Sequence, residues 1–137
     1  WAYSVGSGID TFKEFGMVGI GGGFPKDKVG DAVKLIDEIM LGLGGNGKWA
    51  ITKRELEVAK ETYNGRISLR FDEPEKVLSM AMNDLLTEGK FYTPEEIKEN
   101  GKKVTLDQVK EYCNSVFRLE KLNVGLVGDY EKVPFEI

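Results

Sequence analysis

The chain has 137 residues, of which 41% are hydrophobic and 31% charged, and its formal net charge is −4. It contains no histidine and a single cysteine, Cys113, so these residues alone exclude an ordinary histidine zinc site, a histidine-based triad and an intrachain disulfide. Lysine and glutamate are mixed along the chain, which argues against a nucleic-acid partner, and no apolar run reaches the ~18 residues of a membrane span. Without a visible signal peptide, the lone cysteine predicts a cytoplasmic location.

A β-hairpin is predicted at the start of the chain. From Tyr3 to Ile9, larger side chains alternate with glycine or serine, which is the period of two that a strand produces. A turn is expected at Lys13–Gly16, and a second extended run occupies Met17–Gly21. Pro25 then ends this region, because proline has no N–H to continue a ladder.

Helix signals follow from Asp27 to Phe117 and predict about four helices. The starts carry capping boxes, in which two residues three positions apart satisfy free backbone groups, or a proline in the first turn. The signals are Asp27 with a stop in Gly42–Gly47, Thr52 with Glu55, Asp72–Glu75 with a stop at Gly89, Thr93–Glu96 with a stop near Gly101, and Thr105 with Gln108. The glycines of residues 42–47 are expected to adopt the left-handed conformation that often ends a helix.

The last predicted element is a strand at Leu122–Val127, followed by a tail. The order of elements indicates an α+β fold with two N-terminal strands, helices packed on one face of the sheet and one C-terminal strand. Three strands make a thin sheet, and the first begins at residue one. We therefore expect residues 1–137 to be a single, N-terminally truncated domain with an exposed edge beside residues 1–9.

Two glycine-rich segments invite comparison with nucleotide-binding loops. Gly42–Lys48 has the spacing G-x-x-x-x-G-K, but Trp49 stands where a P-loop needs Ser or Thr, and the segment follows a helix instead of a strand. A helix cap and turn explains it better. Gly16–Gly23 lacks the third glycine of the dinucleotide fingerprint, because Phe24 follows. A strand kept narrow for another backbone or a substrate is the alternative there.

Most of the reactive side chains also have structural explanations. The acidic runs Asp72–Glu75 and Glu95–Glu96 lie in predicted first helical turns, where carboxylates complement the helix dipole. Cys113 lies on an apolar helix face without a histidine to activate it, so packing is expected. Tyr3 is different, because it begins a strand among small residues. Its phenol could pack at the sheet rim or donate a hydrogen bond to an oxyanion or substrate carbonyl.

Several short segments, spread over nearly the whole chain, together match the sequence pattern of a known protein family. They are Ala2-Tyr3-Ser4-Val5 with the glycine-rich run Gly19–Pro25, the helix Glu55–Thr62, Thr93–Ile97, Val104–Val109, and Leu122–Asp129 with its end Val127-Gly128-Asp129. In this order and spacing the chain resembles the insulinase/pitrilysin-type zinc metallopeptidases. This family includes the mitochondrial processing peptidase, and its active members carry an inverted H-x-x-E-H motif.

The resemblance implies a supporting role within a larger zinc metallopeptidase. Family members have two similar α+β halves, of which the first binds zinc. The second supplies a tyrosine and an arginine that contact the substrate and polarise the scissile carbonyl. Tyr3 falls on that tyrosine, whereas the arginine would lie upstream of Trp1. The chain would thus be the zinc-free, C-terminal domain of an enzyme that cleaves extended peptides. Zinc would be bound elsewhere, and the chain alone would be inactive.

The resemblance also implies partners, and it leaves alternatives open. A peptide substrate is expected, together with the remainder of the same protein or another subunit in a homodimer, and neither nucleic acid nor a membrane. Similar Ala-Tyr-Ser segments occur in both halves of the family, so the assignment to the second half rests on the closing strand and the short tail that ends at Ile137. A non-catalytic structural homologue and an autonomous α+β binding domain are the other hypotheses. An H-x-x-E-H motif upstream would favour the peptidase.

Overall fold

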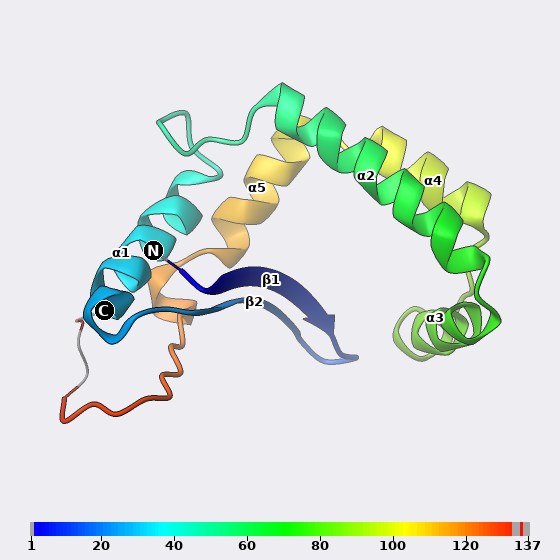
Figure 1. The fold of residues 1–137 in the computed structure, drawn as a ribbon. Helices are drawn as coiled ribbons and strands as arrows, with labels where there is room; N and C mark the ends of the chain where they lie inside the picture. The colour runs from blue at the N-terminus through cyan, green and yellow to red at the C-terminus, as the bar shows by residue number, and fades with distance from the viewer. Residues whose placement is uncertain (1, 133–134, 136–137) are drawn as a thin grey trace. The chain divides into compact units, whose positions relative to one another are not determined.

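The computed structural model describes residues 2–132 and 135 (Figure 1). Its class is α+β, as predicted, with two paired strands and five α-helices among the described residues, instead of about four. Contacts divide the chain into two compact units. Unit 1 comprises residues 1–10, 17–51 and 109–137, and unit 2 comprises residues 11–16 and 52–108.

The predicted hairpin is confirmed. Strand β1 (Ser4–Thr11) pairs with β2 (Gly16–Gly23) as an antiparallel two-stranded sheet. In the connecting turn, the N–H of Phe12 donates to the carbonyl of Phe15 over 2.8 Å, and the two rings stack with centroids 4.6 Å apart. All eight residues of β1 are exposed, so this strand contributes no buried side chain.

In unit 1, a short 3-10 turn, η1 (Lys26–Lys28), leads from β2 into helix α1 (Val29–Gly42). The spacing of apolar residues along α1 predicts one apolar face, and Val29 and Ala32 of that face are buried. Helix α5 (Leu106–Val116), most of which belongs to this unit, buries Cys113. Its start is fixed by the predicted pair, because Thr105 N–H donates to Gln108 Oε1 at 2.9 Å and Gln108 N–H donates to Thr105 Oγ1 at 3.2 Å.

The glycines after α1 serve a purpose other than the predicted one. Among the described residues only Gly89 has a positive φ, of 71°, so the left-handed conformation predicted for residues 42–47 is wrong. A Cβ on Gly42 would lie 2.8 Å from the Cβ of Trp49, and a Cβ on Gly44 would lie 2.7 Å from the carbonyl oxygen of Lys110. These glycines permit close approach instead. The segment follows a helix, as the cap-and-turn interpretation requires.

The strand predicted at Leu122–Val127 is not confirmed. After a second 3-10 turn, η2 (Leu119–Lys121), residues 122–127 belong to no regular element, and the sheet of the described residues contains β1 and β2 alone. The side chains of residues 122–127 suit a strand, but no neighbouring backbone pairs with this run in the sheet. Without a ladder partner, the N–H and C=O groups of such a run stay with solvent.

Unit 2 contains helices α2 (Lys53–Phe71), α3 (Pro74–Thr87) and α4 (Pro94–Lys103). Helix α2 contacts both others, and Figure 1 shows α4 alongside it. Lys60 Nζ donates to the carbonyl of Lys102 at 3.1 Å, and Lys98 Nζ donates to Ser68 Oγ at 2.8 Å, so two lysines connect α2 with α4.

The core of unit 2 is smaller than the sequence pattern suggests. The apolar spacing along α2 predicts that Leu56, Ala59, Tyr63 and Ile67 are buried on one face. Leu56 and Ile67 are buried, whereas Ala59 and Tyr63 are exposed. A Cβ on Gly101 would lie 3.4 Å from the Tyr63 ring. The tyrosine therefore packs on the backbone of α4 at a position without a side chain, which leaves its outer surface uncovered.

The contribution of the capping box at the start of α2 to the stability of the chain can be tested. Thr52 N–H donates to Glu55 Oε2 at 2.8 Å, and Glu55 N–H donates to Thr52 Oγ1 at 3.2 Å. The Thr52 hydroxyl also donates to Glu55 Oε2 at 2.7 Å, and the hydrogen bonds from Thr52 lower the pKa of Glu55. We expect Thr52→Ala to destabilise the chain by ~1 kcal/mol, measured by urea denaturation.

The lowered pKa of Glu55 gives this prediction a pH dependence. The contribution of Glu55 to stability is complete above the ordinary glutamate pKa and is lost as the pH falls through the lower pKa of the folded state. The difference between the wild type and Thr52→Ala should therefore shrink on acidification. A difference that stays constant down to the acid transition would contradict the role of the charged carboxylate.

Candidate functional site

Tyr3 lies immediately before β1 in unit 1. Its backbone N–H donates to the carbonyl of Gly23 over 2.8 Å, which extends the ladder by one residue beyond the strand ends. The side chain is 80% exposed, so it is not packed at the sheet rim. The phenol is thus presented to solvent from a hydrogen-bonded backbone position, where a ligand can reach it.

The glycines of β2 next to Tyr3 allow the backbones to approach closely. A Cβ on Gly22 would lie 2.6 Å from the carbonyl oxygen of Ser4 and 2.9 Å from the ring of Phe24. The close approach of β1 therefore requires a glycine at position 22. Of the glycines in β2, Gly22 comes nearest to the sequence-based suggestion that this strand is kept narrow for another backbone. By contrast, a Cβ on Gly21 would meet nothing within 4 Å.

An apolar groove lies between the hairpin and α1, within unit 1. Its volume is about 330 Å³, and it is lined by Val5, Gly6, Ser7, Ile20, Ile36 and Ile39. The sequence analysis did not predict this groove, which depends on how α1 lies against the hairpin. Gly6 is the only glycine in its lining, and a Cβ there would meet nothing within 4 Å.

The hairpin and the groove together can accommodate an extended peptide. In a two-stranded sheet each strand keeps one edge unpaired, and such an edge presents backbone donors and acceptors to an added strand. The groove beside Val5 and Ile20 is apolar and can receive alternate side chains of that strand. Tyr3, immediately before β1, could then donate a hydrogen bond to a peptide carbonyl.

The described residues do not fit a zinc ion. They contain no group of three or more His, Cys, Asp or Glu side chains that could hold a metal, and the sequence contains no histidine. Cys113 is 6% exposed, and burial raises the pKa of its thiol. The predicted packing role of Cys113 is confirmed, because desolvation opposes the thiolate that a nucleophile or metal ligand needs.

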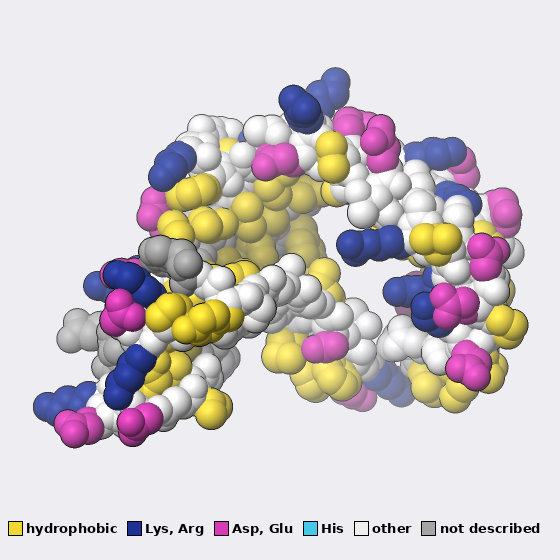
Figure 2. Space-filling view, in the orientation of Figure 1, with side chains coloured by type: hydrophobic (Ala, Val, Ile, Leu, Met, Phe, Trp, Pro, Cys, Tyr) yellow, Lys and Arg dark blue, Asp and Glu magenta, His cyan; other side chains and the backbone are white. Residues whose placement is uncertain are grey.

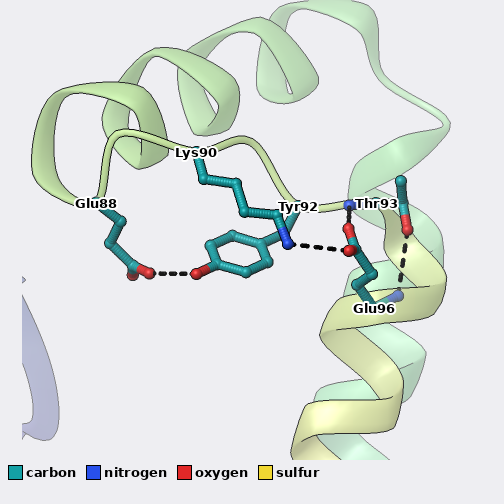
Figure 3. Close-up of polar contacts among 5 residues, drawn as sticks. All are labelled: Glu88, Lys90, Tyr92, Thr93 and Glu96. Carbon is teal, nitrogen blue, oxygen red and sulfur yellow. Dashed lines mark hydrogen bonds and ion pairs between the residues drawn. The ribbon is translucent and has the colours of Figure 1, made fainter.

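The acidic residues at the start of α4 form a capping network (Figure 3). Thr93 N–H donates to Glu96 Oε2 at 2.9 Å, and Glu96 also pairs with Lys90 at 3.0 Å. The Thr93 backbone contributes most to lowering the pKa of Glu96, and Lys90 contributes next. Tyr92 donates its hydroxyl to Glu88 Oε2 at 2.7 Å. The predicted role as a helix cap is confirmed.

An open polar cleft of about 410 Å³ lies beside this network in unit 2. Its lining includes Lys90, Tyr92, Glu96 and Lys103. The first three make the hydrogen bonds of the capping network, so their polar groups already have partners. The cleft is therefore a weaker candidate site than the hairpin and its groove.

Across the described residues, no helix combines the length and the apolar character needed to cross a membrane.

The chain was compared with protein families and with known proteins. No family model matches the chain. Over 129 residues it is 25% identical to a protein of Mycobacterium leprae named an uncharacterized zinc protease. The chain is thus distantly similar to a zinc protease. The matched region covers 94% of this chain and 28% of the relative, so the chain spans little more than a quarter of the relative's length.

Proposed function

We propose that this chain is part of a zinc-dependent metalloendopeptidase and that β1 and Tyr3 contact an extended peptide substrate. The distant zinc protease relative, matched along 94% of the chain, supports the enzyme class. The resemblance of the Ala2–Val5 region to insulinase-type peptidases supports the finer assignment to the zinc-free domain. The observation that carries the proposal is that every residue of β1 is exposed, with Tyr3 80% exposed beside it.

The residues of this chain bind and orient the substrate in this proposal. The peptide adds as a strand to the free edge of the hairpin, and its side chains enter the groove lined by Ile20, Ile36 and Ile39. The Tyr3 hydroxyl donates a hydrogen bond to the carbonyl oxygen as negative charge develops there. Zinc is bound by segments outside these 137 residues, and the chain alone is inactive. Those segments belong to the remainder of the same protein or to another subunit of a homodimer.

Replacing Tyr3 by phenylalanine in the longer protein that contains this chain tests the proposal. We expect kcat/KM for an extended peptide to fall about 100-fold, since that is the cost of removing one donor to an oxyanion. Tyr112→Phe is the matched control, because Tyr112 is also exposed, at 51%, but lies on α5. It should leave kcat/KM unchanged. Equal kcat/KM for Tyr3→Phe and the wild type would show that the Tyr3 hydroxyl has no role in the reaction.

The structural homologue remains the competing hypothesis. A longer protein without H-x-x-E-H, and without zinc-dependent cleavage of any extended peptide, would favour it over the peptidase. Cleavage that is abolished by a chelator and restored by zinc would favour the peptidase.

A further inference from the structure

The apolar groove of unit 1 lies along β1. Three consecutive residues of that strand, 5–7, belong to its lining, whereas β2 contributes Ile20 alone. Helix α1 contributes Ile36 and Ile39. Strand β1 pairs with β2 along one edge, and its other edge has no strand partner in the described part of the chain. A peptide that adds to this edge would therefore lie next to the groove.

The lining of the groove carries no charge. Its side chains are aliphatic apart from the hydroxyl of Ser7, and Gly6 adds only backbone. In Figure 2 the hairpin is largely white, the colour of backbone and small residues, and hydrophobic side chains of unit 1 appear beside it. A charged side chain would lose water here without gaining a partner, whereas an apolar one gains free energy as it leaves water. The groove therefore selects apolar side chains.

The size of the groove favours large side chains over small ones. Its volume is about 330 Å³. An apolar cavity of ~150 Å³ is enough for a benzene ring. The groove can thus admit a phenylalanine ring or the branched side chain of leucine or isoleucine, whereas alanine or glycine would leave most of it unfilled.

The place of Tyr3 determines which residue of the peptide reaches the groove. Tyr3 precedes Val5 by two positions and Ser7 by four. Residues of an added strand lie opposite those of its neighbour at the same spacing. An antiparallel addition is the more stable per residue, and in it the peptide residues opposite Val5 and Ser7 precede the one opposite Tyr3. With the Tyr3 hydroxyl at the cleaved carbonyl, the groove receives a side chain roughly two to four residues before the cleaved bond.

We propose that this groove is a specificity subsite, which selects peptides with leucine, isoleucine or phenylalanine roughly two to four residues before the cleaved bond. The inference rests on the proposed function, because it needs a peptide held by β1 with its carbonyl at Tyr3. It adds the class of substrate and the side chains that choose it, Ile20, Ile36 and Ile39.

Cleavage of a peptide library by the longer protein that contains this chain is the first test. The library varies one residue at a time on both sides of the cleaved bond, and mass spectrometry identifies the products. At one position before the bond, we expect leucine, isoleucine or phenylalanine to give at least about tenfold faster cleavage than aspartate or lysine.

The outcomes of this test separate the subsite from the enzyme class. Zinc-dependent cleavage without an apolar preference before the bond would overturn the subsite and leave the proposed function standing. The same holds for a preference found only after the bond. No zinc-dependent cleavage of any peptide would overturn both.

A charge placed in the groove tests whether these side chains form the subsite. Ile20 is 36% exposed on β2, so Ile20→Lys adds a cation to the lining at a position that water already reaches. We expect the preference for phenylalanine to be lost and glutamate to be favoured about tenfold at the same peptide position. The matched control is Met17→Lys, which adds the same charge to β2 at a 53% exposed residue outside the lining. It should keep the wild-type preference.

An uncharged variant gives an independent measurement. Ile39→Ala widens the groove, so the preferred residue should shift from leucine towards tryptophan. Equal shifts for Ile20→Lys and Met17→Lys, or a wild-type preference in both groove variants, would overturn the assignment of the subsite to this groove.

Discussion

Replacing Ile67 by alanine is expected to lower the free energy of unfolding by about 2–5 kcal/mol, measured by urea denaturation. Ile67 is 4% exposed. Among the described residues of unit 2, Leu56 is the only other buried residue. The truncation removes transfer free energy and leaves a cavity that three helices cannot fill without moving. Because so few side chains are buried here, each carries a large share of the stability of the unit.

A control for this prediction lies two residues further along the same helix. Leu69 is 68% exposed, so Leu69→Ala removes a similar volume without opening a cavity. Its effect should remain within about 0.5 kcal/mol of the wild type. Similar losses at positions 67 and 69 would show that Leu69 is covered in solution and that the core of unit 2 is assigned wrongly.

Replacing Gly22 by alanine is the second change with a large expected effect. The added Cβ would lie 2.6 Å from the carbonyl oxygen of Ser4, a backbone atom that cannot turn aside. We expect a loss of about 1–3 kcal/mol, because the strands must separate to admit the methyl group. Thermal denaturation measures the loss.

The neighbouring glycine isolates the steric cause. Gly21 is, like Gly22, an exposed glycine of β2, but a Cβ added to Gly21 would meet nothing within 4 Å. Gly21→Ala should be neutral or slightly stabilising, since alanine reduces the freedom of the unfolded chain. If both substitutions destabilised the chain equally, the loss would come from the backbone conformation of the strand and not from a clash with Ser4.

Local features were the most predictable from the sequence. The boxes at Thr52, Thr93 and Thr105 depend on residues three positions apart, and the structure contains all three with their hydrogen bonds. The stop of α3 at Gly89 needs only a glycine with a positive φ. These elements are fixed by interactions within one or two helical turns, which a short sequence window contains.

Features that need a distant partner were less predictable. The alternation at Leu122–Val127 correctly indicates side chains suited to a strand, but a strand also needs a neighbouring backbone. Tyr63 has the spacing of a core residue, yet its neighbour is the side-chain-free Gly101. The groove beside Ile20 depends on how α1 lies against the hairpin. For Tyr3 the sequence left open packing at the sheet rim and hydrogen bonding to a substrate, and its role in substrate binding stays a prediction.

The division of the chain has a consequence for how it folds. Unit 1 is built from both ends of the sequence, whereas most of unit 2 is the continuous stretch 52–108. For α5 to meet the segment after α1, as in the bond from Lys110 Nζ to Asn46 Oδ1, the chain must close a loop over that whole stretch. Loop closure costs conformational entropy, and the cost is smaller once the loop is already ordered. Early formation of the local contacts in α2, α3 and α4 is therefore expected to speed the meeting of the two ends of the sequence.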